Sequence, residues 1–272
     1  MECSEANRWH GEPLGQKKLL VLAPKSYGDV FERSRHLWLL TDDWKVVLPE
    51  EVLPLFERVF SNAHLAVYAQ PLPSFDVWTD LMDGLALALK ETHRPKATRF
   101  VASESAIAKY LGLKPQCGNL VGLCWRATQR EAKSDWEKWR LLRPGEIAKL
   151  AAIPNVTWVN LQYGEKLPVP SLNPAFETWD DTAGLIHNLD AVVSVDTAVA
   201  HLAAGMGKST FILHGVAPTS VVTYTDFTAM YPGNVKEFKP DYGGSHPLRA
   251  EDKLIRFVQE RHPAIWRLAG KV

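Results

Sequence analysis

Cysteine is scarce in this sequence, and long apolar runs are missing from it. The only cysteines among its 272 residues are Cys3, Cys117 and Cys124. Their odd number and their spacing exclude a disulfide framework and a cysteine-ligated zinc site, and they fit a reduced, cytoplasmic environment best. No stretch approaches the roughly 18 uninterrupted apolar residues of a transmembrane helix. The polar N-terminus (MECSEANRWHGEPLG) lacks the pattern of a signal peptide, so we expect no membrane insertion.

An excess of charge of either sign is also missing. Lys and Arg total 31, and Asp and Glu total 31, so the formal net charge is zero. No overall field therefore favours binding to nucleic acid or to a membrane surface. Hydrophobic residues make up 46% of the chain, which is enough for a sizeable core. The length fits one large domain or two of about 135 residues.

Short apolar runs alternate with helical patterns along the whole chain. The expected strands are 17–23, 44–48, 65–68, 75–78, 99–102, 120–125, 156–161, 191–195, 209–213 and 235–238. The expected helices are 30–40, 50–60, 84–90, 103–111, 143–152, 181–188, 198–206 and 250–261, while residues 216–233 read as irregular. This alternation is typical of a doubly wound α/β fold with parallel sheets.

Residues 112–119 (GLKPQCGN) have the composition of a linker, with two glycines and a proline between periodic segments. The sequence therefore predicts two α/β domains, 1–113 and 118–272. If the carboxyl ends of their strands face each other, these ends line a cleft, which is a preferred place for a ligand.

The strongest candidate site lies in residues 189–215, which read as strand, helix and strand. Asp196 and Thr197 interrupt the pattern where the first strand ends and the helix begins. Ligands of α/β sheets bind at such strand ends, and a helix N-terminus favours phosphate. His201 follows one turn later on the same helical face. Asp196 as a helix cap and His201 as a structural residue are equally open from the spacing alone.

Residues 194–208 (SVDTAVAHLAAGMGK), preceded by DTAGLIHNLDAVV, resemble the donor-binding half of the heptosyltransferase-like glycosyltransferases. The similarity is closest to the branch that is often fused to tetratricopeptide repeats, and it continues through VTWVNLQYGE, VGLCW and GEPLGQKKLLVLAPKSYGDV. It implies the glycosyltransferase B architecture: two Rossmann-like domains facing across a cleft. The first would be the acceptor side and the second would bind the nucleotide sugar. In relatives of this architecture the C-terminal helix, here 250–261, returns to the first domain.

The resemblance also implies roles for individual residues. Asp29 would be the general base, next to acceptor-side residues Lys25, Tyr27 and Gly28. The residues expected at the donor are Arg126, Lys133, Lys138, Gln162, Gly164, Asp196, Thr197 and His201. Asp29 as a helix cap and 126–140 as a solvated basic loop remain open alternatives. The chain departs from the family in having one glycine before Asp29, in the Trp-rich and charged loop at 126–140, and in residues 217–234, which do not align.

Together these features predict a glycosyltransferase that moves a sugar from a nucleotide sugar to an acceptor hydroxyl. No Asp-x-Asp pair occurs in the chain, which argues against metal-dependent transfer; we therefore expect no metal and no cofactor, with cations and a helix N-terminus stabilising the leaving diphosphate. The alternatives are a non-catalytic nucleotide-sugar or glycan-binding protein and, less favoured, a nucleotide-sugar epimerase of related fold. The acceptor (glycan, protein side chain or hydroxylated nucleobase) and the oligomeric state stay open.

Overall fold

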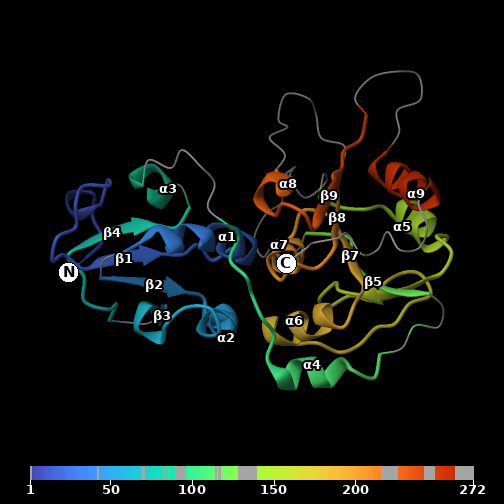
Figure 1. The fold of residues 1–272 in the computed structure, drawn as a ribbon, viewed down its shortest axis with the longest axis horizontal. Helices are drawn as coiled ribbons and strands as arrows, with labels where there is room; N and C mark the ends of the chain where they lie inside the picture. The colour runs from blue at the N-terminus through green and yellow to red at the C-terminus, as the bar shows by residue number, and fades with distance from the viewer. Residues whose placement is uncertain are drawn as a thin grey trace. The chain divides into compact units, whose positions relative to one another are not determined.

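Two parallel β-sheets organise the chain in the computed structural model, one in each of two units, Met1–Val101 and Ala102–Val272 (Figure 1). The structure describes residues 2–41, 43–68, 71–82, 84–89, 96–113, 115, 118–127, 140–215, 226–241 and 249–260. The α/β class and the parallel pairing expected from the sequence are confirmed.

The first unit has a four-stranded sheet in the order β3-β2-β1-β4, with all neighbours parallel. Its strands are β1 (Leu19–Leu22), β2 (Trp44–Leu48), β3 (Leu65–Val67) and β4 (Val77–Asp80). Its α-helices are α1 (Tyr27–Arg33), α2 (Leu53–Glu57) and α3 (Gly84–Ala88). The 3-10 segments are η1 (Glu5–Asn7), η2 (Ser34–Leu39), η3 (Glu50–Val52) and η4 (Asn62–His64). Strand β1 is central and apolar throughout, as a strand covered on both faces requires.

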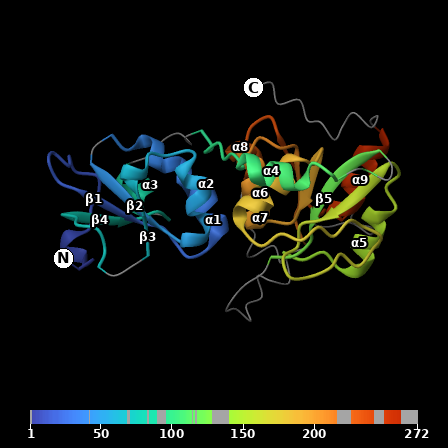
Figure 2. The same cartoon turned by 90° about the horizontal axis from the view of Figure 1, so that it is seen from below.

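The second unit has a five-stranded parallel sheet in the order β6-β5-β7-β8-β9. The strands are β5 (Asn119–Cys124), β6 (Val156–Asn160), β7 (Ala191–Ser194), β8 (Thr210–Leu213) and β9 (Val235–Phe238). The helices are α4 (Glu104–Tyr110), α5 (Pro144–Ala151), α6 (Trp179–His187), α7 (Ala198–Gly205), α8 (Phe227–Met230) and α9 (Ala250–Glu260). Figure 2 shows the same elements from a second direction.

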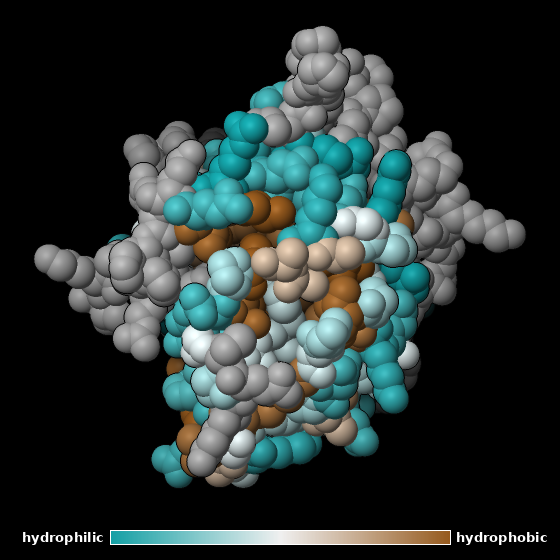
Figure 3. Space-filling model, turned by 90° about the vertical axis from the view of Figure 1, so that its right-hand side faces the viewer, coloured by the Kyte–Doolittle hydropathy of each residue, from teal (hydrophilic) through white to brown (hydrophobic). Residues whose placement is uncertain are grey.

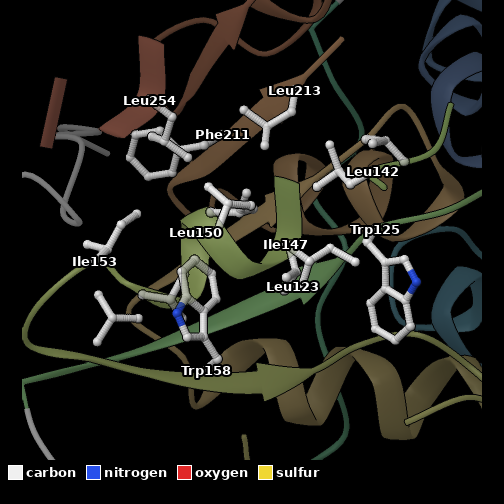
Figure 4. Close-up of a cluster of buried hydrophobic side chains, with 14 of the residues drawn as sticks. Leu123, Trp125, Leu142, Ile147, Leu150, Ile153, Trp158, Phe211, Leu213 and Leu254 are labelled. Carbon is white, nitrogen blue, oxygen red and sulfur yellow. The ribbon is translucent and has the colours of Figure 1, made fainter. Parts of the chain in front are cut away.

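A large apolar cluster holds α5 and α9 against this second sheet. Leu150 of α5, Phe211 of β8 and Leu254 of α9 are fully buried in it (Figure 4). We expected the C-terminal helix to return to the first domain, whereas its apolar face packs here, over Ala250–Glu260, in the core of the second unit. Lys149 of α5 fixes the same contact from outside through Asp252, at 2.8 Å.

Helix α4 also packs in the second unit, although the sequence boundary placed it in the first domain. The Ser103 Oγ that caps α4 donates to Asp180 Oδ2 of α6 at 2.6 Å, and the Ser103 amide donates to Asp180 Oδ1 at 3.0 Å. Gly184 of α6 lets the backbone of Ala106 approach closely. The units therefore divide before α4, while the linker-like residues 112–119 follow it.

Local differences from the sequence expectations concern helix ends and short helices. Helix α1 begins at Tyr27 with Ser26 at the N-cap position, so Asp29 is its third residue and not its cap. The helix expected at 50–60 is shorter and starts with a 3-10 turn. Helix α8 lies in a segment that we expected to be irregular, whereas residues 99–102, expected to be extended, form no strand.

On the face shown in Figure 3, hydrophilic residues predominate and hydrophobic ones form small groups between them. Within the described part of the chain, no helix has the length and apolar character needed to cross a membrane.

Candidate functional site

Several polar residues expected at the donor, together with His214, lie at the carboxyl edge of the second sheet. Because β6, β5, β7 and β8 are parallel neighbours, the residues that follow them lie side by side along one edge. Arg126 follows β5, Gln162 follows β6, Asp196 follows β7 and His214 follows β8. The structure thus brings four segments that are far apart in the sequence to one edge.

Thr197 caps helix α7 and fixes the turn that contains Asp196. Its Oγ1 accepts a hydrogen bond from the Ala200 amide at 3.2 Å and lies 2.9 Å from Ser194 Oγ. Thr197, and not Asp196, is therefore the N-cap residue. The next amides, of Ala198 and Val199, have no acceptor among the described residues. They give the start of α7 the unpaired donors and the positive dipole end that favour an anion.

Asp196 is held by one cation and one imidazole. Arg140 Nη2 lies 3.3 Å from Asp196 Oδ1, and Arg140 Nε donates to the Asp196 carbonyl at 2.6 Å. His201 Nε2 lies 3.7 Å from the same Oδ1. Burial raises the pKa of Asp196, but His201 and Arg140 outweigh it and lower the pKa to about 2. The carboxylate therefore stays ionised throughout the physiological pH range.

His201 is buried, with only 4% of its surface exposed. Its Nδ1 lies 3.1 Å from the Tyr231 hydroxyl, and its ring stacks on Phe227 with centroids 4.4 Å apart. These two aromatic residues come from α8 and the residue after it, an element that the sequence analysis missed. This packing holds the imidazole so that its Nε2 faces the Asp196 carboxylate.

Gln162 connects the ends of β5 and β6. Its buried Oε1 accepts from the Arg126 amide at 3.1 Å, and the Cys124 thiol donates to the same atom at 3.6 Å. Burial raises the pKa of Cys124 to about 11, so this thiol is neutral. The exposed Arg126 guanidinium pairs with Glu165 at 2.7 Å. Gly164 lies in the turn between Gln162 and Glu165, and its φ of +73° is a backbone conformation that favours glycine.

Two predicted donor residues, Lys133 and Lys138, lie outside the described residues. Arg140 closes the same basic loop and contacts Asp196, although the sequence analysis did not select it among the loop's five basic residues. A second omission is His214, whose Nε2 lies 2.8 Å from Glu237 Oε1 of β9. Both pairs join residues distant in the sequence, so no local spacing could have indicated them.

The residues expected on the acceptor side follow β1 in the first unit. Lys25 is exposed, whereas Tyr27, Gly28 and Asp29 form the first turn of α1 and are partly exposed. The Asp29 side chain makes no hydrogen bond or ion pair with any residue in the described ranges. A carboxylate in the first helical turn interacts favourably with the helix dipole.

Several solved structures of similar fold are glycosyltransferases. The chain is similar to a glycosyl transferase family 9 protein of Veillonella parvula, at 12% identity and a TM-score of 0.54, over 94% of this chain and 95% of that one. It is similar to the ADP-heptose LPS heptosyltransferase II of E. coli, at 13% identity and 0.55, over 90% and 100%. The chain has the glycosyltransferase B fold. At such identities the likeness concerns the fold alone.

A third solved structure is TibC of enterotoxigenic E. coli, an iron-containing dodecameric heptosyltransferase, at 11% identity and a TM-score of 0.51, over 78% of this chain and 62% of that one. No protein-family model and no curated protein matches the sequence. Within the described ranges, no group of three or more His, Cys, Asp or Glu side chains is placed to hold a metal ion.

Proposed function

We propose that this protein is a heptosyltransferase-like glycosyltransferase, which moves a sugar from a nucleotide-sugar donor to an acceptor hydroxyl. The observation that carries the proposal is the Asp196-Thr197 turn, which places an ionised carboxylate and the free amides of a helix N-terminus at the carboxyl edge of a parallel sheet. The glycosyltransferase B fold supports it, and a heptosyltransferase of this fold has been solved in complex with ADP-heptose. The motif at 194–208 supports our assignment of the chain to the branch often fused to tetratricopeptide repeats.

The donor diphosphate would bind at the start of α7. The Ala198 and Val199 amides would donate to its oxygens, and Arg126 and Arg140 would supply positive charge at the same edge, together with Lys133 and Lys138 from the basic loop. Gln162 and Gly164 would border the nucleotide. Amide donors and cations aimed at the leaving diphosphate stabilise the charge that develops there, which is the part a metal plays in other transferases. The absence of an Asp-x-Asp pair from the sequence supports a reaction without a metal.

In the reaction, the acceptor oxygen forms a bond to the anomeric carbon while the bond from that carbon to the diphosphate oxygen breaks. The acceptor proton passes to a carboxylate, and the nucleoside diphosphate leaves with the bonding electrons. We assign the proton to Asp29, whose carboxylate is partly exposed and unpaired among the described residues. Lys25, Tyr27 and Gly28 would contribute to the acceptor side.

A panel of ADP-, UDP- and GDP-sugars tests the proposal. Calorimetry with the corresponding diphosphates and nucleosides should show at least one diphosphate binding more tightly than its nucleoside, because the diphosphate contacts carry the site. Incubation with the matching nucleotide sugar should release nucleoside diphosphate. Binding without any release, with water or with acceptor extracts, would instead indicate a non-catalytic sugar-nucleotide-binding protein. No binding by any diphosphate would contradict the donor site itself.

A further inference from the structure

A pocket of about 310 Å³ opens in the first unit, where the chain enters β2 and β3. We propose that this pocket binds an uncharged sugar ring. Its described lining residues come from η2 and the turn after it, the first residue of β2, and the segment that leads into β3. They are Leu37, Trp38, Leu40, Thr41, Trp44, Val59, Phe60, Ser61 and His64.

The floor of the pocket is apolar and closely packed. Leu37, Trp44 and Phe60 are almost completely buried, and the Trp44 and Phe60 rings meet edge to face with centroids 6.3 Å apart. Such packing fixes the floor before any ligand arrives, which lowers the ordering cost of binding.

An aromatic platform stands at the rim. One face of Trp38 packs on Phe60, with ring centroids 4.6 Å apart, yet 53% of the tryptophan remains exposed. Its Nε1 donates to Thr98 Oγ1 at 3.3 Å, which holds the indole in place. The electron-rich face of an indole attracts the weakly positive C–H groups on one face of a pyranose ring. A large exposed indole that is fixed in position therefore suits a sugar.

Hydrogen-bonding groups complete the rim. His64 stacks on Trp44 at 4.1 Å, and its Nδ1 lies 2.9 Å from the Trp44 carbonyl oxygen, so Nδ1 is the donor of that bond. In a neutral ring this leaves Nε2 as an acceptor for a sugar hydroxyl. The exposed hydroxyls of Thr41 and Ser61 lie on the same rim and both donate and accept.

The side chains that line the pocket favour a neutral sugar over a charged ligand or an apolar side chain. Among the lining residues that the structure describes, none is Asp, Glu, Lys or Arg, so these residues offer neither a phosphate nor a carboxylate a permanent counter-charge. A purely apolar side chain would cover the rim hydroxyls and the imidazole without pairing them, which is unfavourable. A neutral sugar satisfies both the aromatic floor and the polar rim.

The pocket is distinct from the candidate acceptor side. Asp29 follows the carboxyl end of β1, whereas the pocket residues precede β2 and β3 and so lie at the amino edge of the same parallel sheet. A sugar bound here would not be the reacting one. It would be a remote unit of a glycan, or a free sugar, held by a second site.

Saturation-transfer NMR and titration with the whole chain test this assignment. The probes are methyl β-glucoside, methyl β-galactoside and N-acetylglucosamine, with glycerol as a polyol without a ring and N-acetyltryptophanamide as an apolar side chain. At least one sugar should bind, with saturation strongest on its C–H protons, and glycerol should not. Trp38→Ala should weaken the binding about three- to tenfold, because one stacking contact is lost. Leu39→Ala is the matched control, since Leu39 is an exposed neighbour that does not line the pocket.

A second variant guards against a misfolded Trp38→Ala protein. Thr41→Arg leaves every packed ring in place and fills the mouth of the pocket from an exposed rim position, so it should abolish sugar binding without lowering the melting temperature. Binding that persists in both variants, or no binding of any sugar by the wild type, would overturn the assignment. Binding of N-acetyltryptophanamide without any sugar would overturn it in favour of a docking site for an apolar side chain. None of these results depends on nucleotide binding.

Discussion

Arg140 binds both the main chain and the side chain of Asp196. Its Nε donates to the Asp196 carbonyl at 2.6 Å, and its Nη2 lies 3.3 Å from Oδ1. This contact ties the end of the basic loop to the turn that begins α7. It places a guanidinium beside the helix N-terminus, where the proposed diphosphate would bind.

Replacing Arg140 by lysine should weaken the binding of nucleoside diphosphates about tenfold. Lysine keeps the charge but cannot make two directed contacts at once, so the turn and the cation both lose their fixed position. Calorimetry on Arg140→Lys measures the effect. Arg256→Lys, at an exposed position of α9, serves as control and should bind as the wild type does. If Arg140→Lys binds nucleoside diphosphates as tightly as Arg256→Lys does, Arg140 only joins the loop to the turn and does not contribute to binding.

The sheets were predictable from the sequence because most buried parallel strands appear in it as short apolar runs. Trp44–Leu48 forms a strand with the expected bounds, and so does Val235–Phe238, although Lys236 and Glu237 stand between its two buried residues. Helix ends were less predictable where two capping residues compete. Ser26 and Asp29 both suit an N-cap, and Ser26 occupies that position, without a side-chain hydrogen bond to the helix. Helix α8 has only four residues, too few to produce a helical period.

The site was predictable only in part. The position of Asp196 and Thr197 between a strand end and a helix start could be predicted, because strand, turn and helix follow one another directly. The partners of Asp196 and His201 could not, because Arg140 and Tyr231 reach them across the fold. Helix α4 was assigned to the first domain because glycine and proline mark residues 112–119, whereas the contact of Ser103 with Asp180 depends on tertiary packing.

Chelation should leave the proposed activity largely intact. In the proposed reaction the amides at the start of α7 and the nearby cations stabilise the leaving diphosphate, so that no metal is needed there. Turnover of the nucleotide sugar is measured before and after EDTA treatment, with the metal content of the protein determined by mass spectrometry. Loss of activity on chelation and its return with manganese, magnesium or iron would contradict the metal-free reaction.

The His214–Glu237 pair should make stability depend on pH in the acid range. Burial raises the pKa of Glu237, but hydrogen bonds from His214 and Thr228 outweigh it and lower the pKa from 4.5 to about 2. A carboxyl with a lowered folded pKa stabilises the protein above its unfolded pKa, and this stabilisation is lost as pH falls from about 4.5 to about 2.

Urea unfolding of Glu237→Gln at several pH values across that window tests this. The variant should be less stable than the wild type at neutral pH, and its free energy of unfolding should fall less steeply as the solution is acidified. Glu177→Gln, at an exposed position, should follow the wild-type curve. Parallel curves for Glu237→Gln and the wild type would show that the pair contributes nothing to acid stability.

Gly184→Ala should destabilise the second unit by about 1–3 kcal/mol. A Cβ at this position would lie 2.4 Å from the backbone carbonyl of Ala106, so α4 and α6 would have to separate. Gly145→Ala is the matched control, because a Cβ there meets nothing within 4 Å, and it should be neutral or slightly stabilising. Chemical denaturation measures both. If Gly184→Ala unfolds like the control, α4 does not pack on α6 as described.

Asp29→Asn should lower turnover by roughly two to four orders of magnitude while leaving donor affinity unchanged. An acceptor hydroxyl must lose its proton as it attacks the anomeric carbon, and a positioned carboxylate typically contributes ~10²–10⁴-fold to such a step. Because Asp29 is the third residue of α1 and not its cap, the variant loses only a dipole interaction of about 0.3–1 kcal/mol and should melt close to the wild type. Glu57→Gln, at an exposed position of the same unit, controls for the loss of one negative charge.

Steady-state kinetics, calorimetry with the diphosphate and thermal melting separate the outcomes. Normal turnover in Asp29→Asn would place the base elsewhere, whereas a parallel loss of turnover and donor affinity would mean that the residue supports binding and not proton transfer.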